Sequence, residues 1–552
     1  MKKRTKIILI ILAALLLFGS LSLVYLRKSR SAAAVSFRSW AKQVLVKVGM
    51  PRKDSALRDA EKLLPEGWEL VEDDVIGFAL GLPADAVRVD YIVPGVAVFE
   101  GEGFRVSVSR EWSVEADVAQ YVGYYFNRFV LDEDYRRANG LTLLGHASGP
   151  EYDRIELRID TDAVSGNRVE LDTYIYANFF TSTQSFYRVM MKYDSTSAVA
   201  AHMPSTVTDT FYSYRGQEIG ESDKHFAPVA NPNWNDETHS LYERISNTDD
   251  VMWGIFTQHV ESEGIDVTIP AMEEKLGAKF DVILNYEPIT YDGYSVLFPT
   301  EFMEKAHADG KVIELTYQLT HNNNENLFEA SPSLELYKAG DNETIRRFAR
   351  AAAEFGHPFL FRLNNEMNSD WTNYSGVVNL QDPDIYVETW RTIFNIFEEE
   401  GAHNAIWIWN PHDRSYPPAE WTHYLAYYPG DEYVHMLGIT GYNNGDYYAQ
   451  RYNEYWREFD EIYGLIIEEL GGRFDAFPWI ITEFGSSSFG GDKAKWIDGM
   501  FDAIGKYERI KVAVWFSYAD FDDDGTIARP YWLDETEETL EAFRRGLQAD
   551  RD

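Results

Sequence analysis

The chain has 552 residues, 45% of them hydrophobic, so it can bury large cores, and its length favours two or three domains. Its formal net charge of -38 would repel a nucleic-acid backbone, and no long basic run follows residue 60, so we expect no nucleic-acid partner. The absence of cysteine excludes disulfides, a thiol nucleophile and cysteine metal sites.

The N-terminus carries an apolar run, residues 7–26, that is long enough to cross a bilayer. Basic residues precede it: Lys2, Lys3, Arg4 and Lys6. The positive-inside rule then places the N-terminus in the cytoplasm. We therefore predict a transmembrane anchor within residues 1–30, a location in the cell membrane, and a main body outside the cytoplasm. The alternative is a signal peptide cleaved near residues 32–34, which would give a secreted protein.

Residues 31–75 are predicted to be a spacer, and residues 76–215 a small α+β domain. Apolar and polar residues alternate at 104–109, which predicts a strand. A helix-compatible run follows at 114–130, and a hairpin comes after it. The order of strand, Glu111-Trp112, helix and long antiparallel strands loosely resembles the PsbP/Mog1-like domains of exported bacterial proteins. The histidines in this domain and just after it are not spaced as metal ligands, so we assign the domain no chemistry. They are His146 and His202 in the domain and His225 in the stretch that follows.

Residues 216–250 are polar and rich in turns, and they are predicted to be a linker. From 251 to 548, short β-branched or aromatic runs alternate with helix-length amphipathic stretches eight times. The predicted strands are 251–257, 280–286, 312–318, 358–363, 405–409, 434–440, 479–482 and 512–517. This repeat predicts an α/β fold, a (β/α)8 TIM barrel with its chemistry on the loops after the strands. An open doubly wound sheet is the alternative, disfavoured because no glycine-rich phosphate turn follows the first strand.

Two carboxylates follow predicted barrel strands. Glu366 comes after the fourth strand and Glu483 after the seventh, so both side chains can face each other across the barrel mouth. Cleavage of a glycosidic bond requires such a pair, one to protonate the leaving oxygen and one to attack or stabilise the anomeric carbon. The alternative is that both are loop carboxylates in ion pairs.

The residues around both carboxylates resemble glycoside hydrolase family 26 of clan A, the β-mannanase family, over about residues 251–545. Arg362 and Glu366-Met-Asn368 match that family's acid/base motif, and Trp371 matches an aromatic residue a few places on. Further matches in the family's order include Trp407-Ile-Trp-Asn-Pro411, Gly441-Tyr442 and Thr482-Glu-Phe-Gly485. The resemblance implies a retaining mechanism, with Glu366 as acid/base and Glu483 as nucleophile, and no metal or cofactor.

The resemblance also implies roles for neighbouring residues. Arg362 and Tyr442 are expected to hold Glu483 ionised, and Trp515 is expected to form the aromatic platform under the sugar, with Trp371 a weaker candidate. Family 26 mannanases usually have histidine where this chain has Asn365. Asparagine can still donate to the sugar 2-hydroxyl, so catalysis is expected to persist while mannan specificity is less certain.

An acidic stretch, residues 520–525, carries the opening of a calcium loop. Position 12 of that loop would be Tyr531 rather than a bidentate glutamate, which favours a solvated acidic loop.

The sequence thus predicts a membrane-anchored, endo-acting β-glycoside hydrolase whose partner is a β-linked polysaccharide, with mannan as the first expectation. β-Glucan, β-xylan or the cell's own exopolysaccharide are alternative substrates. A catalytically inactive glycan-binding surface protein is the rival from another class. Protein partners are left open.

Overall fold

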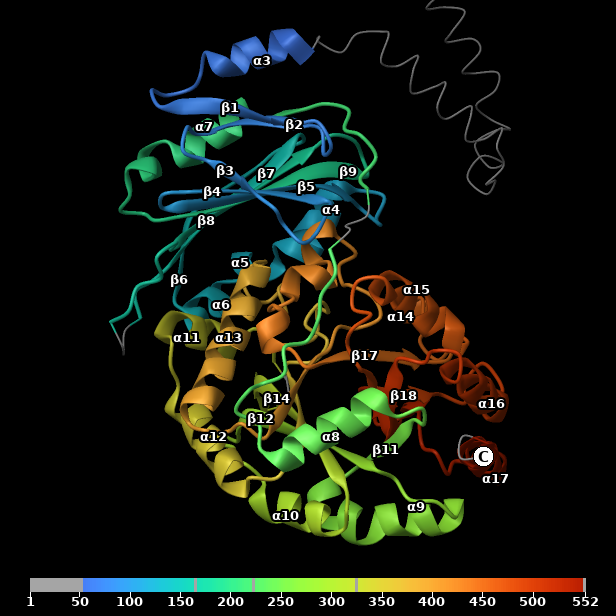
Figure 1. Ribbon diagram of the computed structural model, residues 1–552. Helices are drawn as coiled ribbons and strands as arrows, with labels where there is room; N and C mark the ends of the chain where they lie inside the picture. Colours follow the sequence, from blue (N-terminus) through green and yellow to red (C-terminus); the bar gives the residue numbers. More distant parts are fainter. Residues whose placement is uncertain (1–52, 163–165, 221–223, 323–325, 550–552) are drawn as a thin grey trace, which may run out of the picture.

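The computed structural model describes residues 53–162, 166–220, 224–322 and 326–549 (Figure 1). The predicted anchor at 7–26 lies outside these residues. Within the part of the chain that is described, no helix is both long and apolar enough to cross a membrane.

An accessory domain precedes the barrel and contains two antiparallel sheets. The larger has the order β3-β4-β5-β9-β8-β7-β6, and the smaller has the order β1-β2-β10. The bounds are β1 (Trp68–Asp73), β2 (Phe78–Pro83), β3 (Val87–Val89), β4 (Val96–Gly101), β5 (Phe104–Trp112), β6 (Leu141–Ser148), β7 (Tyr152–Ile159), β8 (Thr173–Phe180), β9 (Ser185–Tyr193) and β10 (Tyr212–Ser213). The predicted hairpin is confirmed, because β7 and β8 pair antiparallel.

The accessory domain begins earlier than we predicted. Helix α3 (Lys53–Glu61) and strand β1 lie in the stretch that we assigned to the spacer, and β1 pairs with the fully buried β2 along its whole length. Only one residue of β1 is buried, so its own sequence carries little of the apolar alternation that identifies a strand. Its partner, rather than its composition, makes it a strand.

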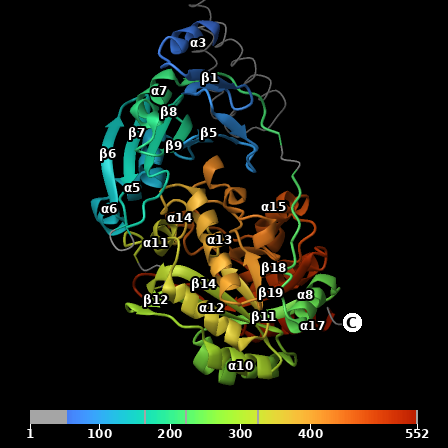
Figure 2. The same cartoon turned by 60° about the vertical axis from the view of Figure 1, so that its left-hand side comes forward.

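The predicted helix at 114–130 is present but interrupted. It consists of α4 (Val118–Tyr121), the π-helical turn η1 (Val122–Phe126) and α5 (Arg128–Leu131), and α6 (Glu133–Asn139) follows. The Asp117 side chain caps α4 by accepting from the Ala119 amide at 2.9 Å. Figures 1 and 2 show α5 and α6 between the accessory sheet and the barrel, near α11 (Pro332–Ala339). The remaining helices of this domain are η2 (Ala198–Ala201) and α7 (Met203–Thr210).

The predicted barrel is confirmed, with all eight predicted strands in place. They are β11 (Met252–Thr257), β12 (Val282–Tyr291), β14 (Val312–His321), β15 (Phe359–Leu363), β16 (Ala405–Trp409), β17 (Met436–Asn443), β18 (Trp479–Ser486) and β19 (Ile510–Ser517). Each pairs in parallel with its neighbours, and β11 pairs with both β12 and β19, which closes the sheet. Three short strands of this domain are not among the eight barrel strands: β13 (Tyr294–Ser295), β20 (Ala519–Phe521) and β21 (Ile527–Pro530).

Side chains fill the barrel on both sides of its wall, in alternation along each strand. The interior cluster contains Val282, Leu284, Leu360, Ile406, Ile408, Met436, Ile480, Val512 and Val514. The outer layer packs under the helices η3 (Val260–Thr268), α9 (Ile269–Leu276), α10 (Thr300–Ala308), α11, α12 (Glu343–Phe355), α13 (Pro383–Glu399), α14 (Ala449–Tyr452), α15 (Phe459–Gly471), α16 (Lys493–Ile504) and α17 (Glu537–Ala549), with short turns η5 (Glu420–Thr422), η6 (Tyr424–Tyr427) and η7 (Asp431–Tyr433).

Two local predictions differ from the structure. Part of the predicted linker forms α8 (Asp236–Asn247), whose Leu241 and Ile245 join the interior cluster of the barrel. The last helix, 534–547 in our prediction with a cap at Asp534, begins instead at Glu537, because Thr536 and Thr539 exchange backbone and hydroxyl hydrogen bonds at 3.2 Å.

The accessory domain is joined to the barrel by buried charges. Lys192 of β9 contacts Asp382 at 2.8 Å and Asp384 at 2.6 Å, at the N-terminus of α13. Arg188, also on β9, donates to the Gln381 side chain at 2.7 Å. Such pairs are costly to separate, so the two domains form one packed unit.

Candidate active site

Glu366 lies in a turn directly after β15. The strand ends at Leu363, and Asn364 and Glu366 then adopt positive φ angles of 48° and 58°. Positive φ is uncommon for residues with a Cβ, and such strain is concentrated at functional sites. The Glu366 amide donates to the Asn410 carbonyl, just past the end of β16, at 2.8 Å. The turn therefore holds Glu366 at the barrel mouth.

Glu483 faces the barrel mouth because β18 contains an irregularity. Ile480 belongs to the interior cluster and Ile481 to the outer layer, so strict alternation would turn Glu483 outward. The register shifts here: Ile439 of β17 pairs with Ile481, but the next residue, Thr440, pairs with Glu483. A bulge of this kind re-aims one side chain, so Thr482 and Glu483 both point inward and Phe484 returns to the outer layer.

Three donors surround the Glu483 carboxylate. Arg362 NH1 lies 3.3 Å from Oε1, the Asn365 amide donates to the same oxygen at 3.3 Å, and the Tyr286 hydroxyl donates to Oε2. These contacts favour an ionised carboxylate. Arg362 thus lies beside Glu483, and Asn365, which we expected to contact the sugar, also contacts this carboxylate.

We expected Tyr442 to stabilise the ionised Glu483, but the hydroxyl that contacts Glu483 belongs to Tyr286. Tyr442 lines the cleft but packs against Phe516 and Tyr531, with ring centroids 5.8 and 4.9 Å away. Tyr286, whose hydroxyl donates to Glu483, belongs to strand β12. Sequence reasoning missed Tyr286, although it ended the second predicted strand, where functional residues of a barrel concentrate.

Arg362 and Asn365 are themselves fixed by buried partners. Arg362 donates to Thr316 at 2.7 Å and to Asn410 at 3.1 Å, and it pairs with the buried Glu314 at 3.1 Å. The Asn365 side-chain oxygen accepts from Gln318 at 2.8 Å and from the Tyr374 hydroxyl at 3.0 Å. Asn365 therefore presents its amide nitrogen toward Glu483 and the cleft.

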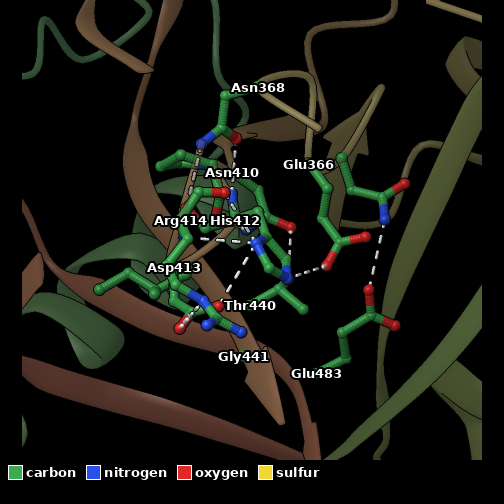
Figure 3. A network of polar contacts seen from close by, with 12 residues as sticks. Glu366, Asn368, Asn410, His412, Asp413, Arg414, Thr440, Gly441 and Glu483 are labelled. Atoms are coloured by element: carbon green, nitrogen blue, oxygen red, sulfur yellow. Dashed lines mark hydrogen bonds and ion pairs between the residues drawn. The ribbon is translucent and has the colours of Figure 1, made fainter. Parts of the chain in front are cut away.

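The environment of Glu366 differs from that of Glu483 (Figure 3). Its nearest cation candidate is His412, whose Nε2 lies 4.0 Å from Oε1. Asn368 holds the His412 backbone through bonds of 2.8 and 3.2 Å, and the Trp371 ring meets the imidazole edge to face at 5.0 Å. His412 also lines the cleft.

Burial is the main influence on the pKa of both carboxyl groups. It raises the pKa of Glu366, an effect that His412 and Arg362 partly oppose. Burial, and then the charge of Asp520, raise the pKa of Glu483 to about 8. A two-carboxylate mechanism requires a proton on Glu366 and an ionised Glu483. Placing that proton on Glu366 depends on the three donors to Glu483.

We expect the Asp520→Asn variant to shift the acidic limb of the pH profile to lower pH. Removing the negative charge of Asp520 stabilises ionised Glu483 and lowers its pKa, so the active form persists further into acid. The measurement is kcat/KM against pH. Asp523→Asn is the matched control, because Asp523 is 92% exposed in the same loop. An acidic limb that stays in place, or moves equally in both variants, would contradict the prediction.

The expectation for Trp515 is wrong. Trp515 is fully buried in the outer layer, where it packs against Phe484, Trp496 and Phe543, and its ring nitrogen donates to the Tyr531 carbonyl at 2.9 Å. Alternation along β19 directs Trp515 outward and its neighbour Phe516 inward. Phe516 lines the cleft, as does Trp371, which is 41% exposed.

The carboxylates open into a cleft of about 2390 Å³. Aromatic and polar side chains from several strand ends line it, including Tyr286, Gln318, Asn365, Trp371, Tyr416, Tyr442, Tyr452, Phe516 and Tyr531. Asp520 belongs to the β20–β21 hairpin and pairs with Arg529 at 2.8 Å, rather than forming a calcium loop.

One cluster of potential metal ligands occurs among the described residues, and it lies outside this cleft. Glu237 accepts from His307 and His357 at 2.7 Å each, at the opposite end of the barrel strands. Each oxygen of the Glu237 carboxylate therefore accepts one hydrogen bond from a histidine.

The structure is a closed (β/α)8 barrel with one buried carboxylate directly after its fourth strand, Glu366, and one within its seventh, Glu483, and both line one cleft. Residues 314–477 match the model of Glycosyl hydrolase family 26. The predicted resemblance to that family is thereby confirmed.

One curated protein is similar in sequence to this chain. Endoglucanase H from Acetivibrio thermocellus is 26% identical over 295 residues, which are 52% of this chain and 30% of that protein. The chain therefore spans about a third of the length of this curated relative.

Two solved structures are also similar. A family 26 β-mannanase from Bacteroides ovatus has 17% identity and a TM-score of 0.43, with 57% of this chain and 94% of that chain covered. The catalytic domain of an endo-β-1,4-mannanase from Bacillus sp. JAMB-750 has 18% identity and a TM-score of 0.42, with coverages of 60% and 95%.

Proposed function

We propose that this protein is a retaining, endo-acting β-glycoside hydrolase that cleaves a β-1,4-linked polysaccharide. The observation that carries the proposal is the unequal environment of the two carboxylates. Glu483 has three donors, including a guanidinium at 3.3 Å, whereas Glu366 has a histidine at 4.0 Å. Unequal environments separate the roles of nucleophile and acid.

In the first step Glu483 attacks the anomeric carbon, and Glu366 gives its proton to the leaving oxygen as the glycosidic bond breaks. In the second step Glu366 takes a proton from water, and the resulting hydroxide displaces Glu483 with net retention of configuration. The Asn365 amide is placed to donate to the sugar 2-hydroxyl, a contact that strengthens in the transition state. The Arg362 guanidinium beside Oε1 favours the ionised form of Glu483 and opposes the effect of burial.

Mannan is our first candidate substrate and β-1,4-glucan the second. The similar solved structures are named mannanases, while the curated relative is named an endoglucanase. Asn365 in place of the histidine usual in family 26 mannanases leaves both sugars compatible with the site. An open cleft of about 2390 Å³ suits internal cleavage of a polymer.

The test is a panel of mannan, β-1,4-glucan, mixed-linkage glucan, xylans and host exopolysaccharide, with the anomer of the first product followed by NMR. We expect activity on mannan or β-1,4-glucan, a mixture of internal fragments, and the β-anomer first. An initial α-anomer would show inversion and defeat the mechanism. If no glycan is cleaved but several bind, the protein is an inactive glycan-binding protein instead.

We also propose that residues 7–26 anchor the protein in the cell membrane with the barrel outside the cytoplasm. The support is the length of the apolar run and the basic residues before it. Fractionation of cells that express the full chain tests this proposal. A mature soluble form beginning near Val35 would contradict it.

A further inference from the structure

The wall of the catalytic cleft is not made by the barrel alone. Four side chains of the accessory domain line the same cleft as Glu366 and Glu483: Glu115, Gln120, Tyr124 and Tyr125. Glu115 precedes α4, Gln120 lies within α4, and both tyrosines belong to the π-helical turn η1. We assigned this domain no chemistry from its sequence.

The π-helical turn carries two adjacent tyrosines, the exposed Tyr124 and the half-buried Tyr125. Its ends are anchored in the domain core by Val122 and Phe126, while Tyr124 is 56% exposed. An α-helix gains one extra residue at such a turn, and these turns occur frequently at functional sites. The Tyr124 and Tyr125 rings lie 4.8 Å apart at 85°, so one ring supports the other.

Contacts with the barrel fix the position of this segment. Arg128 lies over the Tyr124 ring at 5.1 Å and pairs with Asp370 at 3.2 Å. Asp370 immediately precedes Trp371, the exposed aromatic residue beside His412 and Glu366. Nearby, the Gln381 side chain donates to the Phe126 carbonyl at 2.7 Å. The tyrosines are therefore held at a set position along the cleft.

We propose that Tyr124 and Tyr125 form a remote sugar-binding subsite, so that one glycan chain contacts both domains. Exposed aromatic faces bind the apolar face of a pyranose, and Glu115 and Gln120 offer polar groups to its hydroxyls. The accessory domain then contributes to the choice of substrate length. This inference rests on the proposed glycosidase function.

The test compares substrates of different length. Wild type and Tyr124→Ala are assayed on a short aryl β-glycoside with a good leaving group and on β-1,4-linked hexasaccharides of mannose and glucose. We expect the ratio of kcat/KM for the hexasaccharide to kcat/KM for the aryl glycoside to fall about 3- to 10-fold in the variant, a size typical of one lost aromatic contact. Tyr124→Phe keeps the ring and should restore the ratio.

Tyr152→Ala is the matched control, because Tyr152 is an exposed tyrosine of the same domain outside the cleft. An unchanged ratio in Tyr124→Ala would overturn the subsite while leaving the proposed function intact. A fall that is equal in Tyr124→Ala and Tyr152→Ala would also overturn it. If wild type cleaves neither the aryl glycoside nor a hexasaccharide, the proposed function fails first. In that case, affinity electrophoresis on mannan and glucan decides the subsite, and equal retardation of wild type and Tyr124→Ala would overturn it.

Discussion

The Glu366→Ala variant is expected to lose about 10²- to 10⁴-fold in kcat on an unactivated glycan, the range for loss of a general acid. Bond cleavage then has no proton donor for the leaving oxygen. With a 2,4-dinitrophenyl glycoside, which needs no protonation, the glycosyl-enzyme should still form. Azide, which needs no base, should then release it as the β-glycosyl azide.

Glu483→Ala should fail differently, with a loss on the order of 10⁴-fold or more and no covalent intermediate. Azide can fill the space of the missing carboxylate and attack directly, so any product is the α-glycosyl azide. Mass spectrometry of the trapped enzyme and NMR of the azide product check both outcomes. Glu354→Ala on the outer face of α12 is the control and should retain activity. The same azide anomer from both variants would refute the assigned roles.

The Lys192→Met variant is expected to lower the free energy of unfolding by about 3–5 kcal/mol, the cost of removing one partner of a buried ion pair. The side chains of Lys192 and Asp382 are only 4% and 1% exposed. Burial alone would lower the pKa of Lys192, but Asp382 and Asp384 outweigh it and raise the pKa well above its usual range. Without the ammonium group, Asp382 is left buried with its charge uncompensated.

Urea unfolding followed by tryptophan fluorescence measures this loss. Arg137→Ala removes an ion pair of the same domain that is 68% exposed on the arginine side, and it should change the midpoint much less. Equal midpoints for Lys192→Met and wild type would show that the contact between the domains adds no stability.

The sequence alone determined the barrel and the two candidate carboxylates at its mouth. Eight short apolar strands separated by amphipathic helices leave few alternatives to a closed parallel sheet. In such a sheet the residues that follow strands four and seven must meet at one end. The position of Glu366 followed from that local pattern, whereas the choice of Arg362 followed from the resemblance to family 26.

Only the tertiary structure decided which side chains reach the cleft. A one-residue bulge in β18 turns Glu483 inward, and strict alternation in β19 turns Trp515 outward and Phe516 inward. Both side-chain directions depend on register with a neighbouring strand, which a single sequence does not encode locally. Tyr286 and Tyr124 reach the cleft for the same kind of reason, since strand closure and domain packing bring together residues that are remote in the chain.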